Sequence, residues 1–369
     1  MLSGTDVFVI GGGPAGLAAA IAARQQGLDV IVADGSKPPI DKACGEGLMP
    51  DSVEALRRLG VELETGDGIS FSCIRFVDER ATATARFSGR LGVGLRRTVL
   101  HGKMLDRADA CGIKFLWETP VTGLGSGGVR LAGGNVVAAR WIVGADGSQS
   151  QVRRWAGVDL ADSRSGRYAC RGHFAVAPWS DCFEINWATS SQAYVTPVSD
   201  HEVCVVVVSR QPDCRLPSAL GEFPELARRL GNAKLSGKVR GAITGTRGLR
   251  RVYCGNVALI GDASGGVDAI TGEGLGLSFH QAEALAEAMA MNDLRRYQQA
   301  HRRFARRPAF MAHVLLLLDG RTHLRHRVLK ALAKYPELFE RLVSIHVGET
   351  SPAHFAATGA QLGWRLLAS

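Results

Sequence analysis

The sequence reads Val7-Phe8-Val9-Ile10-Gly11-Gly12-Gly13-Pro14-Ala15-Gly16 near its start, and this stretch is its most informative feature. The apolar run Val7 to Ile10 is typical of a buried parallel strand, and the alanine-rich segment Ala18 to Gln26 predicts a helix. Between them, Gly11 permits a tight turn, Gly13 leaves room for a pyrophosphate and Gly16 allows close packing of helix on strand. The free N–H groups at the helix start favour phosphate, so this unit predicts a dinucleotide site.

An acidic residue completes this first unit. A second predicted strand, Asp29 to Ala33, ends at Asp34, which follows the first glycine by about 20 residues. An acid at this place accepts hydrogen bonds from a ribose 2′-hydroxyl and disfavours a 2′-phosphate. We therefore expect the site to bind an ADP-ribose group without that phosphate.

Two further glycine stretches follow apolar runs far along the chain. The first, Trp141 to Ser148, reads WIVGADGS, and the second, Val257 to Gly274, reads VALIGDASGGVDAITGEG. Asp262, at a strand end, can accept hydrogen bonds from ribityl hydroxyls, and Gly272 and Gly274 leave space for a flat ring. A long helix starting near Gly274 would direct its positive end at that ring. The three stretches together predict FAD rather than a generic nucleotide.

The excess positive charge is concentrated in one segment. Residues 292–341 contain 12 of the 44 Lys and Arg residues and four of the 35 acidic ones, a net of +8 in a chain of +9. This segment is either a solvated helical face or a surface for an anionic partner: a membrane, an acidic carrier protein, or a substrate with phosphate or carboxylate. No recognised motif or aromatic platform for nucleic acid accompanies the charge, so we expect no nucleic-acid partner.

The cysteines and the terminal segments indicate the cellular setting. Eight cysteines are scattered without a Cys-x-x-Cys pair, which predicts reduced thiols, no disulfide framework and no metal site. The chain enters its first strand too early for a signal peptide. Near the C-terminus, the apolar run Val314 to Leu318 is far shorter than the ~20 residues that span a bilayer. We therefore expect a cytoplasmic protein, with peripheral membrane contact through the basic helices as an alternative.

The pattern of elements predicts an α/β protein with a discontinuous nucleotide domain. We assign residues 1–70, 95–160 and 245–295 to a Rossmann-like FAD-binding domain of the glutathione-reductase type. Residues 71–94 and 161–244 alternate in the manner of strands and predict an interleaved antiparallel substrate sheet. Residues 296–369 form a basic, helical C-terminal segment.

At this point the sequence resembles the para-hydroxybenzoate hydroxylase superfamily of flavoproteins, and within it the geranylgeranyl reductase and flavin-dependent halogenase branch. The resemblance covers nearly the whole chain to about residue 290. It implies that Arg97 lies near FAD, that the backbone at Val121 meets the adenine, and that the Asp146-Gly147 stretch supports the cofactor. The cofactor-binding residues expected on this basis are Gly11, Gly13, Pro14, Ala15, Gly16, Asp34, Gly45, Arg97, Val121, Asp146, Gly147, Gly261, Asp262, Gly272, Gly274 and Leu275.

The loop Asp41 to Pro50 resembles the flavin-adjacent loop of that branch and carries two candidate catalytic groups. Cys44 either lies over the isoalloxazine or is a small apolar filler, and Glu46 either handles a proton or is a surface acid. Tyr194, on the predicted substrate sheet, is the third candidate. His173, on the same sheet, is expected to be a satisfied sheet histidine.

These residues favour a monooxygenase acting on a hydrophobic aromatic, polyketide or isoprenoid substrate. A hydroxylase needs a dry pocket and little acid–base machinery, and the single dinucleotide fingerprint fits NAD(P)H as a transient electron donor. The alternative is a C=C reductase of the geranylgeranyl reductase type, in which a side chain protonates carbon. The segment Tyr194 to Pro197 matches the reductase pattern only in part. A halogenase is less expected, because no Trp-x-Trp-x-Ile-Pro segment is present.

Overall fold

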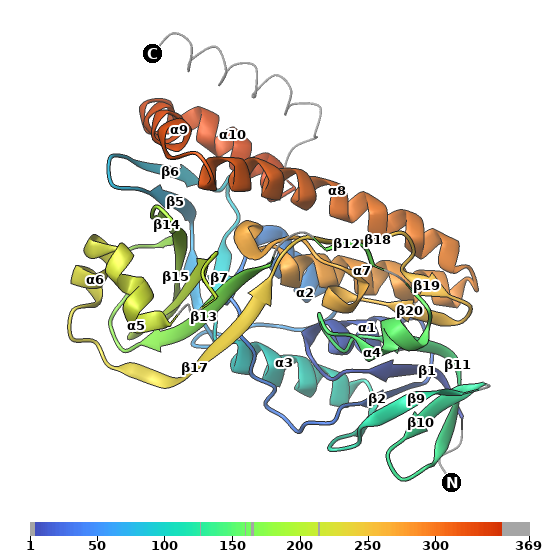
Figure 1. The fold of residues 1–369 in the computed structure, drawn as a ribbon. Coiled ribbons are helices and arrows are strands. Elements are labelled where there is room, and N and C mark those ends of the chain that lie inside the picture. Colours follow the sequence, from blue (N-terminus) through green and yellow to red (C-terminus); the bar gives the residue numbers. More distant parts are fainter. Residues whose placement is uncertain (1–3, 126, 159, 164–165, 213–214, 349–369) are drawn as a thin grey trace.

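The computed structural model describes residues 4–125, 127–158, 160–163, 166–212 and 215–348. Its elements form two large sheets with helices around them (Figure 1). Cys214 and the part of the predicted C-terminal segment beyond Gly348 lie outside the described residues.

The first sheet holds the glycine turns. Its strand order is β19-β20-β11-β1-β2-β8, with the β9–β10 hairpin attached to β11. The central strands β20, β11, β1, β2 and β8 pair in parallel, as the apolar runs predict. The strand bounds are β1 Thr5–Ile10, β2 Val30–Ala33, β8 Lys114–Leu116, β9 Val121–Gly125, β10 Gly128–Leu131, β11 Val136–Gly144, β19 Tyr253–Cys254 and β20 Val257–Leu259.

Both faces of this sheet are covered by other elements. Successive residues of β1 point to opposite faces, so alternate residues enter two different cores. Val7 and Val9 join a core with helices α1 (Pro14–Gln25), α3 (Arg97–Ala110) and α7 (Gly274–Ala290). Phe8 and Ile10 join a second core with the β9–β10 hairpin and α4 (Gln151–Trp155). Helix α1 begins at Pro14, four residues before the expected start at Ala18, with the proline in its first turn.

The second sheet is built mainly from antiparallel pairs. Its order is β17-β13-β16-β15-β14-β5-β6, and the β14–β5 pair is parallel. The strand bounds are β5 Cys73–Val77, β6 Thr82–Arg86, β13 Arg167–Phe174, β14 Cys182–Trp187, β15 Ser191–Ser199, β16 Glu202–Ser209 and β17 Leu235–Thr244. Two small sheets lie beside it, one of β3 (Gly47–Leu48), β7 (Gly92–Gly94) and β4 (Ile69–Phe71), the other of β12 (Leu160–Ser163) and β18 (Arg247–Leu249).

The apolar run of β16 shows why this sheet is covered on both faces. Val203, Val205 and Val207 pack with α5 (Leu216–Ala219) and α6 (Pro224–Leu230), whereas Val206 and Val208 face a core that includes the C-terminal helices. Those helices are α8 (Leu294–Asp319), α9 (Thr322–Lys334) and α10 (Pro336–His346), which lie along one side of both sheets (Figure 1). Helix α2 (Pro50–Arg58) and the 3₁₀ turns Leu220–Glu222, Gly261–Ser264 and Ala269–Thr271 complete the described elements.

One expectation about the cysteines is wrong. Cys73 on β5 and Cys182 on β14 form a disulfide, which the spacing of the cysteines in the sequence does not indicate. The two residues are 109 positions apart in the chain but directly opposite each other in the parallel pair. The free cysteines among the described residues are Cys44, Cys111, Cys170, Cys204 and Cys254.

Candidate functional site

The three glycine stretches line a single cavity of about 360 Å³ at the carboxyl end of the parallel strands. This is where open α/β sheets bind ligands, since the strand ends and helix starts meet there. Of the predicted cofactor residues, the cavity is lined by Gly11, Gly13, Pro14, Ala15, Asp34, Arg97, Val121, Asp146, Gly147, Gly261, Asp262 and Gly274.

The glycines of the first turn have different tasks. Gly11 has φ +113°, and a Cβ there would lie 2.4 Å from the carbonyl oxygen of Ala145. A Cβ on Gly16 would lie 1.9 Å from the carbonyl oxygen of Gly11. Around a Cβ on Gly13, by contrast, the only atom within 4 Å among the described residues is Nη2 of Arg97, at 3.9 Å. Gly11 and Gly16 therefore serve packing, and Gly13 leaves open space for a ligand.

Two side chains hold this turn in place. The Asp34 carboxylate accepts hydrogen bonds from the N–H groups of Gly12, at 2.7 Å, and Ser36, at 2.8 Å. Nε2 of the buried His101, on α3, lies 2.8 Å from the carbonyl oxygen of Gly12 and so donates to it. Burial lowers the pKa of His101, which keeps the ring neutral. His101 was not predicted, because its sequence neighbours give no sign that it reaches the turn.

Two arginines hold the glycine stretch Trp141 to Ser148 beside the stretch Val257 to Gly274. Arg153 donates to the carbonyl oxygens of Ala263 and Ser148, both at 3.1 Å, and Arg247 donates to that of Ser148 at 2.8 Å. Asp146 accepts from two N–H groups at the start of α4 through Oδ2, while its buried Oδ1 has no partner among the described residues. Asp146 lines the first cavity, so a ligand bound there can donate a hydrogen bond to this Oδ1.

Two long helices begin at the cavity. Gly13 precedes α1 and Glu273 precedes α7, and neither residue caps its helix with a side-chain hydrogen bond. The first N–H groups of both helices are therefore open to a ligand, with the partial positive charge of each helix start behind them. An extended anionic dinucleotide fits this arrangement.

A second cavity, of about 250 Å³, continues from the first toward the substrate sheet. The two cavities share Arg97, Asp262 and Gly274. The predicted residues Gly45, Gly272 and Leu275 line the second cavity, as do all three candidate catalytic residues. Sequence reasoning missed its apolar wall, which consists of Ala169, Phe183, Val206, Val208, Ala242, Ile243, Val267 and Ala269.

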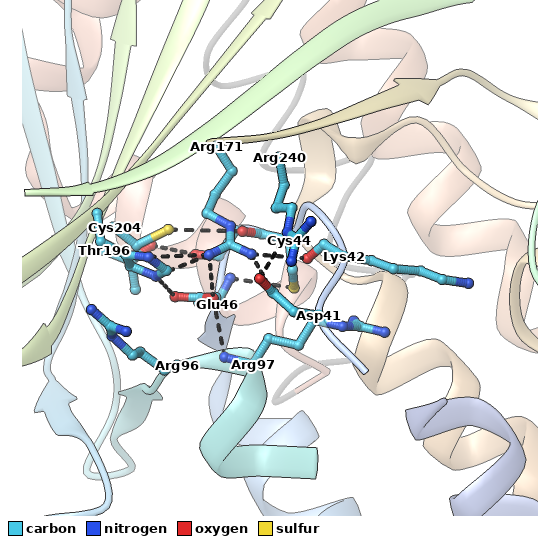
Figure 2. Close-up of polar contacts among 12 residues, drawn as sticks. Asp41, Lys42, Cys44, Glu46, Arg96, Arg97, Arg171, Thr196, Cys204 and Arg240 are labelled. Atoms are coloured by element: carbon cyan, nitrogen blue, oxygen red, sulfur yellow. Dashed lines mark hydrogen bonds and ion pairs between the residues drawn. The ribbon is translucent and has the colours of Figure 1, made fainter. Parts of the chain in front are cut away.

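The loop that carries Cys44 and Glu46 is tied to the substrate sheet by buried polar contacts (Figure 2). Arg171 on β13 pairs with Asp41, and Arg240 on β17 donates to the same carboxylate at 3.0 Å. Burial disfavours the Asp41 carboxylate, but the two arginines outweigh it and hold its pKa below the ordinary value. Thr196 donates to the carbonyl oxygen of Gly45 at 2.6 Å, which fixes the loop beside the cavity.

Glu46 is not a surface acid. Its side chain is only 1% exposed, and its backbone φ is +58°. Oε1 accepts a hydrogen bond from the N–H of Arg97 at 3.0 Å, and Oε2 lies 2.6 Å from Nε2 of His173 (Figure 2). His173 is thus a satisfied sheet histidine, as expected, and its partner is a residue of the predicted catalytic set.

Glu46, His173 and Cys204 place three potential metal ligands within 4.8 Å of one another. Arg171 lies 3.7 Å from Glu46 and supplies a positive charge in the place of a cation. Burial raises the pKa of Cys204 well above its ordinary value, which disfavours the thiolate that binds metals. This cluster is therefore better described as an ion-pair network than as a metal centre.

The other two candidate catalytic residues differ in their surroundings. Cys44 is half-buried, and its sulfur accepts a hydrogen bond from the N–H of Glu46 at 3.4 Å. The Tyr194 hydroxyl donates to Gln192 at 2.9 Å, and burial raises its pKa. A phenol whose proton is already donated and whose ionisation is disfavoured is a poor acid. Cys44 and Glu46 remain the better placed of the three.

The apolar side chains of the C-terminal helices have a structural role. Leu315 and Leu318 on α8, and Leu338 and Phe339 on α10, belong to the core between these helices and the substrate sheet, where α9 and α10 lie against β6. No described residue beyond Leu275 lines the second cavity. Within the described part of the chain, no helix combines the length and the apolar character needed to span a bilayer.

The fold and the joined cavities define a class of protein: a dinucleotide-binding flavoprotein whose cofactor site opens into an apolar chamber. The family described as FAD binding domain matches residues 4–300, and the chain belongs to this family. FAD is therefore its cofactor, and the open glycines, the helix starts and the free oxygen of Asp146 fit that group.

Curated relatives cover most of the chain. Menaquinone reductase of Mycolicibacterium smegmatis is 29% identical over 332 residues, which are 80% of this chain and 78% of that protein. Digeranylgeranylglycerophospholipid reductase 1 of Methanococcoides burtonii is 24% identical over 313 residues, 78% of this chain and 76% of that one. Both are enzymes, and this chain is likewise a flavin-dependent oxidoreductase.

Solved structures share the fold. A flavoprotein/dehydrogenase from Cytophaga hutchinsonii has a TM-score of 0.80 at 19% identity, covering 93% of each chain. The flavin-dependent halogenase CmlS has a TM-score of 0.73 at 22% identity, covering 90% of this chain and 65% of its own. PqsL from Pseudomonas aeruginosa, described as a probable FAD-dependent monooxygenase, has a TM-score of 0.68 at 21% identity, covering 94% of this chain and 100% of its own.

Proposed function

We propose that this chain is an FAD-dependent reductase that saturates a C=C bond in the prenyl chain of a lipid. The observation that carries the proposal is the second cavity, where an apolar wall meets a thiol, Cys44, and a buried carboxyl group, Glu46, beside the predicted flavin site. The names of the curated relatives support the substrate class, because menaquinone and digeranylgeranylglycerophospholipid both carry prenyl chains.

In this proposal FAD occupies the two cavities end to end. Gly13 and the start of α1 bind the pyrophosphate, Asp34 the adenosine ribose and Asp262 the ribityl chain. Arg97 and Gly274, which line both cavities, would hold the flat ring. Reduced FAD supplies the hydride that one alkene carbon receives.

The protein's own residues provide the second hydrogen and the surroundings. The other alkene carbon takes a proton either from Cys44 or from the hydrogen bond between Glu46 and His173, beside the loop anchored by Arg171. Phe183, Val206 and Val208 contact the prenyl chain and exclude water. NADPH, NADH or another carrier reduces the FAD, and the single dinucleotide fingerprint fits a donor that binds transiently.

The monooxygenase favoured by the sequence remains the second candidate, because the same apolar wall would protect an oxygen-transfer step. The two reactions differ in their products. Purified protein is reduced with dithionite, so that the natural donor is not needed, and is mixed with a prenylated naphthoquinone, with and without oxygen. Excess dithionite is removed before substrate or oxygen is admitted, and the products are reoxidised so that the quinone ring is restored. Mass spectrometry then separates the addition of two hydrogens to the prenyl chain from the addition of one oxygen atom.

Anaerobic formation of the saturated chain is the expected result. A product that carries an added oxygen, forms only in air and shows no added hydrogen would overturn the reductase in favour of the monooxygenase. The E46Q variant described in the Discussion links the product to the cavity.

A further inference from the structure

A second basic region lies outside the C-terminal helices. From Leu226 to Gly261 the chain contains no acidic residue and eight basic ones, Arg228, Arg229, Lys234, Lys238, Arg240, Arg247, Arg250 and Arg251. At the centre of this stretch lies β17, the edge strand of the substrate sheet.

Strand β17 exposes a row of large apolar side chains. Leu235 and Val239 are each 43% exposed, and Ile243 is 50% exposed. The three residues are spaced by four, so they lie on one side of the strand, and Gly237 and Gly241 stand between them. Soluble surfaces seldom present aligned apolar residues of this size beside basic ones, and such a patch marks an interaction site.

The edge is poorly suited to pairing with another strand. Residue Arg171 pairs with Arg240 and His173 with Ser236, so one residue of β13 lies opposite the three residues Gly237 to Val239. Gly237 has φ +84° in this bulge. Bulges of this kind interrupt the ladder of backbone groups that strand addition needs. A partner that contacts the side chains rather than the backbone fits this surface better.

The charges beside the row select an anionic partner. Lys234 and Lys238 are exposed, and neither forms an ion pair with any acid in the described ranges. The nearby Arg228 and Arg229 are instead paired with Glu225. Apolar side chains flanked by unpaired lysines match the acyl and headgroup layers of an anionic bilayer.

The surface also continues into the site. Ala242, Ile243 and Thr244, at the end of β17, line the second cavity. The apolar row itself lies on the face of the sheet that α5 covers, and Ala242 on the opposite face, so the row and the cavity meet only at the end of this edge strand, around Ile243 and Thr244. In Figure 1 the first part of β17 lies away from α8, α9 and α10, whereas its last residue, Thr244, contacts the Ala269–Thr271 turn that packs on α8.

We propose that the β17 surface, formed by Leu235, Val239, Ile243, Lys234 and Lys238, docks on anionic lipid bilayers and holds the end of β17, where it lines the second cavity, beside the bilayer. This extends the proposed function by naming where a lipid substrate enters. The docking itself does not depend on turnover, so it is tested separately from the reaction.

The test measures sedimentation of the FAD-loaded protein with phosphatidylglycerol vesicles and with phosphatidylcholine vesicles. The native chain is expected to bind the anionic vesicles preferentially. L235S/V239S and K234E/K238E are each expected to weaken that binding at least about tenfold. Neither pair of residues lines the second cavity, so both variants should retain FAD and turn over a detergent-solubilised substrate.

Two controls make the result specific. V136S removes an apolar residue that is 54% exposed on the first sheet, and it should bind vesicles as the native chain does. R306E/K330E reverses exposed charges on α8 and α9, and it should also bind. Loss of binding in R306E/K330E but not in the β17 variants would overturn the proposal, as would native protein that ignores anionic vesicles. The proposal would also be overturned if the native protein were a dimer and L235S/V239S a monomer, since the apolar row would then bind a second copy of the chain.

Discussion

Oε2 of Glu46 lies 2.6 Å from Nε2 of His173, and the two side chains are 1% and 4% exposed. The other carboxylate oxygen of Glu46 receives the N–H of Arg97, the first residue of α3. One carboxylate thus connects the substrate sheet, the loop Asp41 to Pro50 and the FAD-binding domain. This arrangement explains why an acid is buried at the wall of an apolar cavity.

The first prediction concerns this carboxylate. E46Q keeps an oxygen for the Arg97 N–H but cannot carry a carboxyl proton, so turnover of the prenyl substrate should fall about 100-fold. FAD content should remain that of the native protein, measured as flavin absorbance per chain. E184Q is the matched control, because Glu184 is a buried acid paired with Arg75 that does not line either cavity. Native turnover in E46Q would remove Glu46 from the proton pathway.

The second prediction concerns the first glycine turn. G16A places a methyl group 1.9 Å from the carbonyl oxygen of Gly11, so the turn must shift. We expect FAD affinity to fall at least tenfold, a loss of about 1.4 kcal/mol or more. G102A is the control: Gly102 lies within α3, and a Cβ there meets no described atom within 4 Å. Titration of both apoproteins with FAD decides the matter, and equal affinities would contradict this assignment of Gly16.

The glycine turns were predictable because their requirements are local. The clash at Gly16 involves a residue five positions away, and the strand before it and the helix after it are visible in the apolar pattern. The burial of Glu46 was not predictable, since its partners His173 and Arg97 come from distant segments. The helical pattern around Leu315 to Leu318 likewise showed an apolar face but not the surface that it covers.

The third prediction is a pH dependence of stability. His301 on α8 contacts Ser264 at 2.9 Å, and Ser264 donates to the carbonyl oxygen of Gly261 in the third glycine stretch. Burial, with a smaller contribution from Arg302, lowers the pKa of His301 to about 4 from an ordinary value of 6.5. Between about pH 6.5 and pH 4, His301 is therefore protonated in the unfolded chain but neutral in the folded chain.

As the pH falls through that range, His301 should cost the folded state up to about 3 kcal/mol, and above pH 6.5 it should have no effect. H301Q keeps a donor near the position of Nε2 but does not titrate. Urea unfolding of both proteins from pH 4 to pH 8 should show a steeper loss of stability on acidification in the native chain. Parallel curves would contradict the burial of His301 as a neutral ring.

The fourth prediction concerns the Cys73–Cys182 disulfide. It closes a loop of 109 residues and joins the parallel strands β5 and β14 next to Phe183, a residue of the cavity wall. C73S/C182S should lower the free energy of unfolding by about 2–5 kcal/mol, because the unfolded chain regains the freedom that the cross-link removes. The number of thiols that react in denaturant without reductant should not change, since neither cysteine is free. C254S removes an exposed free thiol and should lower that number by one at unchanged stability. Two additional reactive thiols in the native protein would restore the original expectation of reduced cysteines.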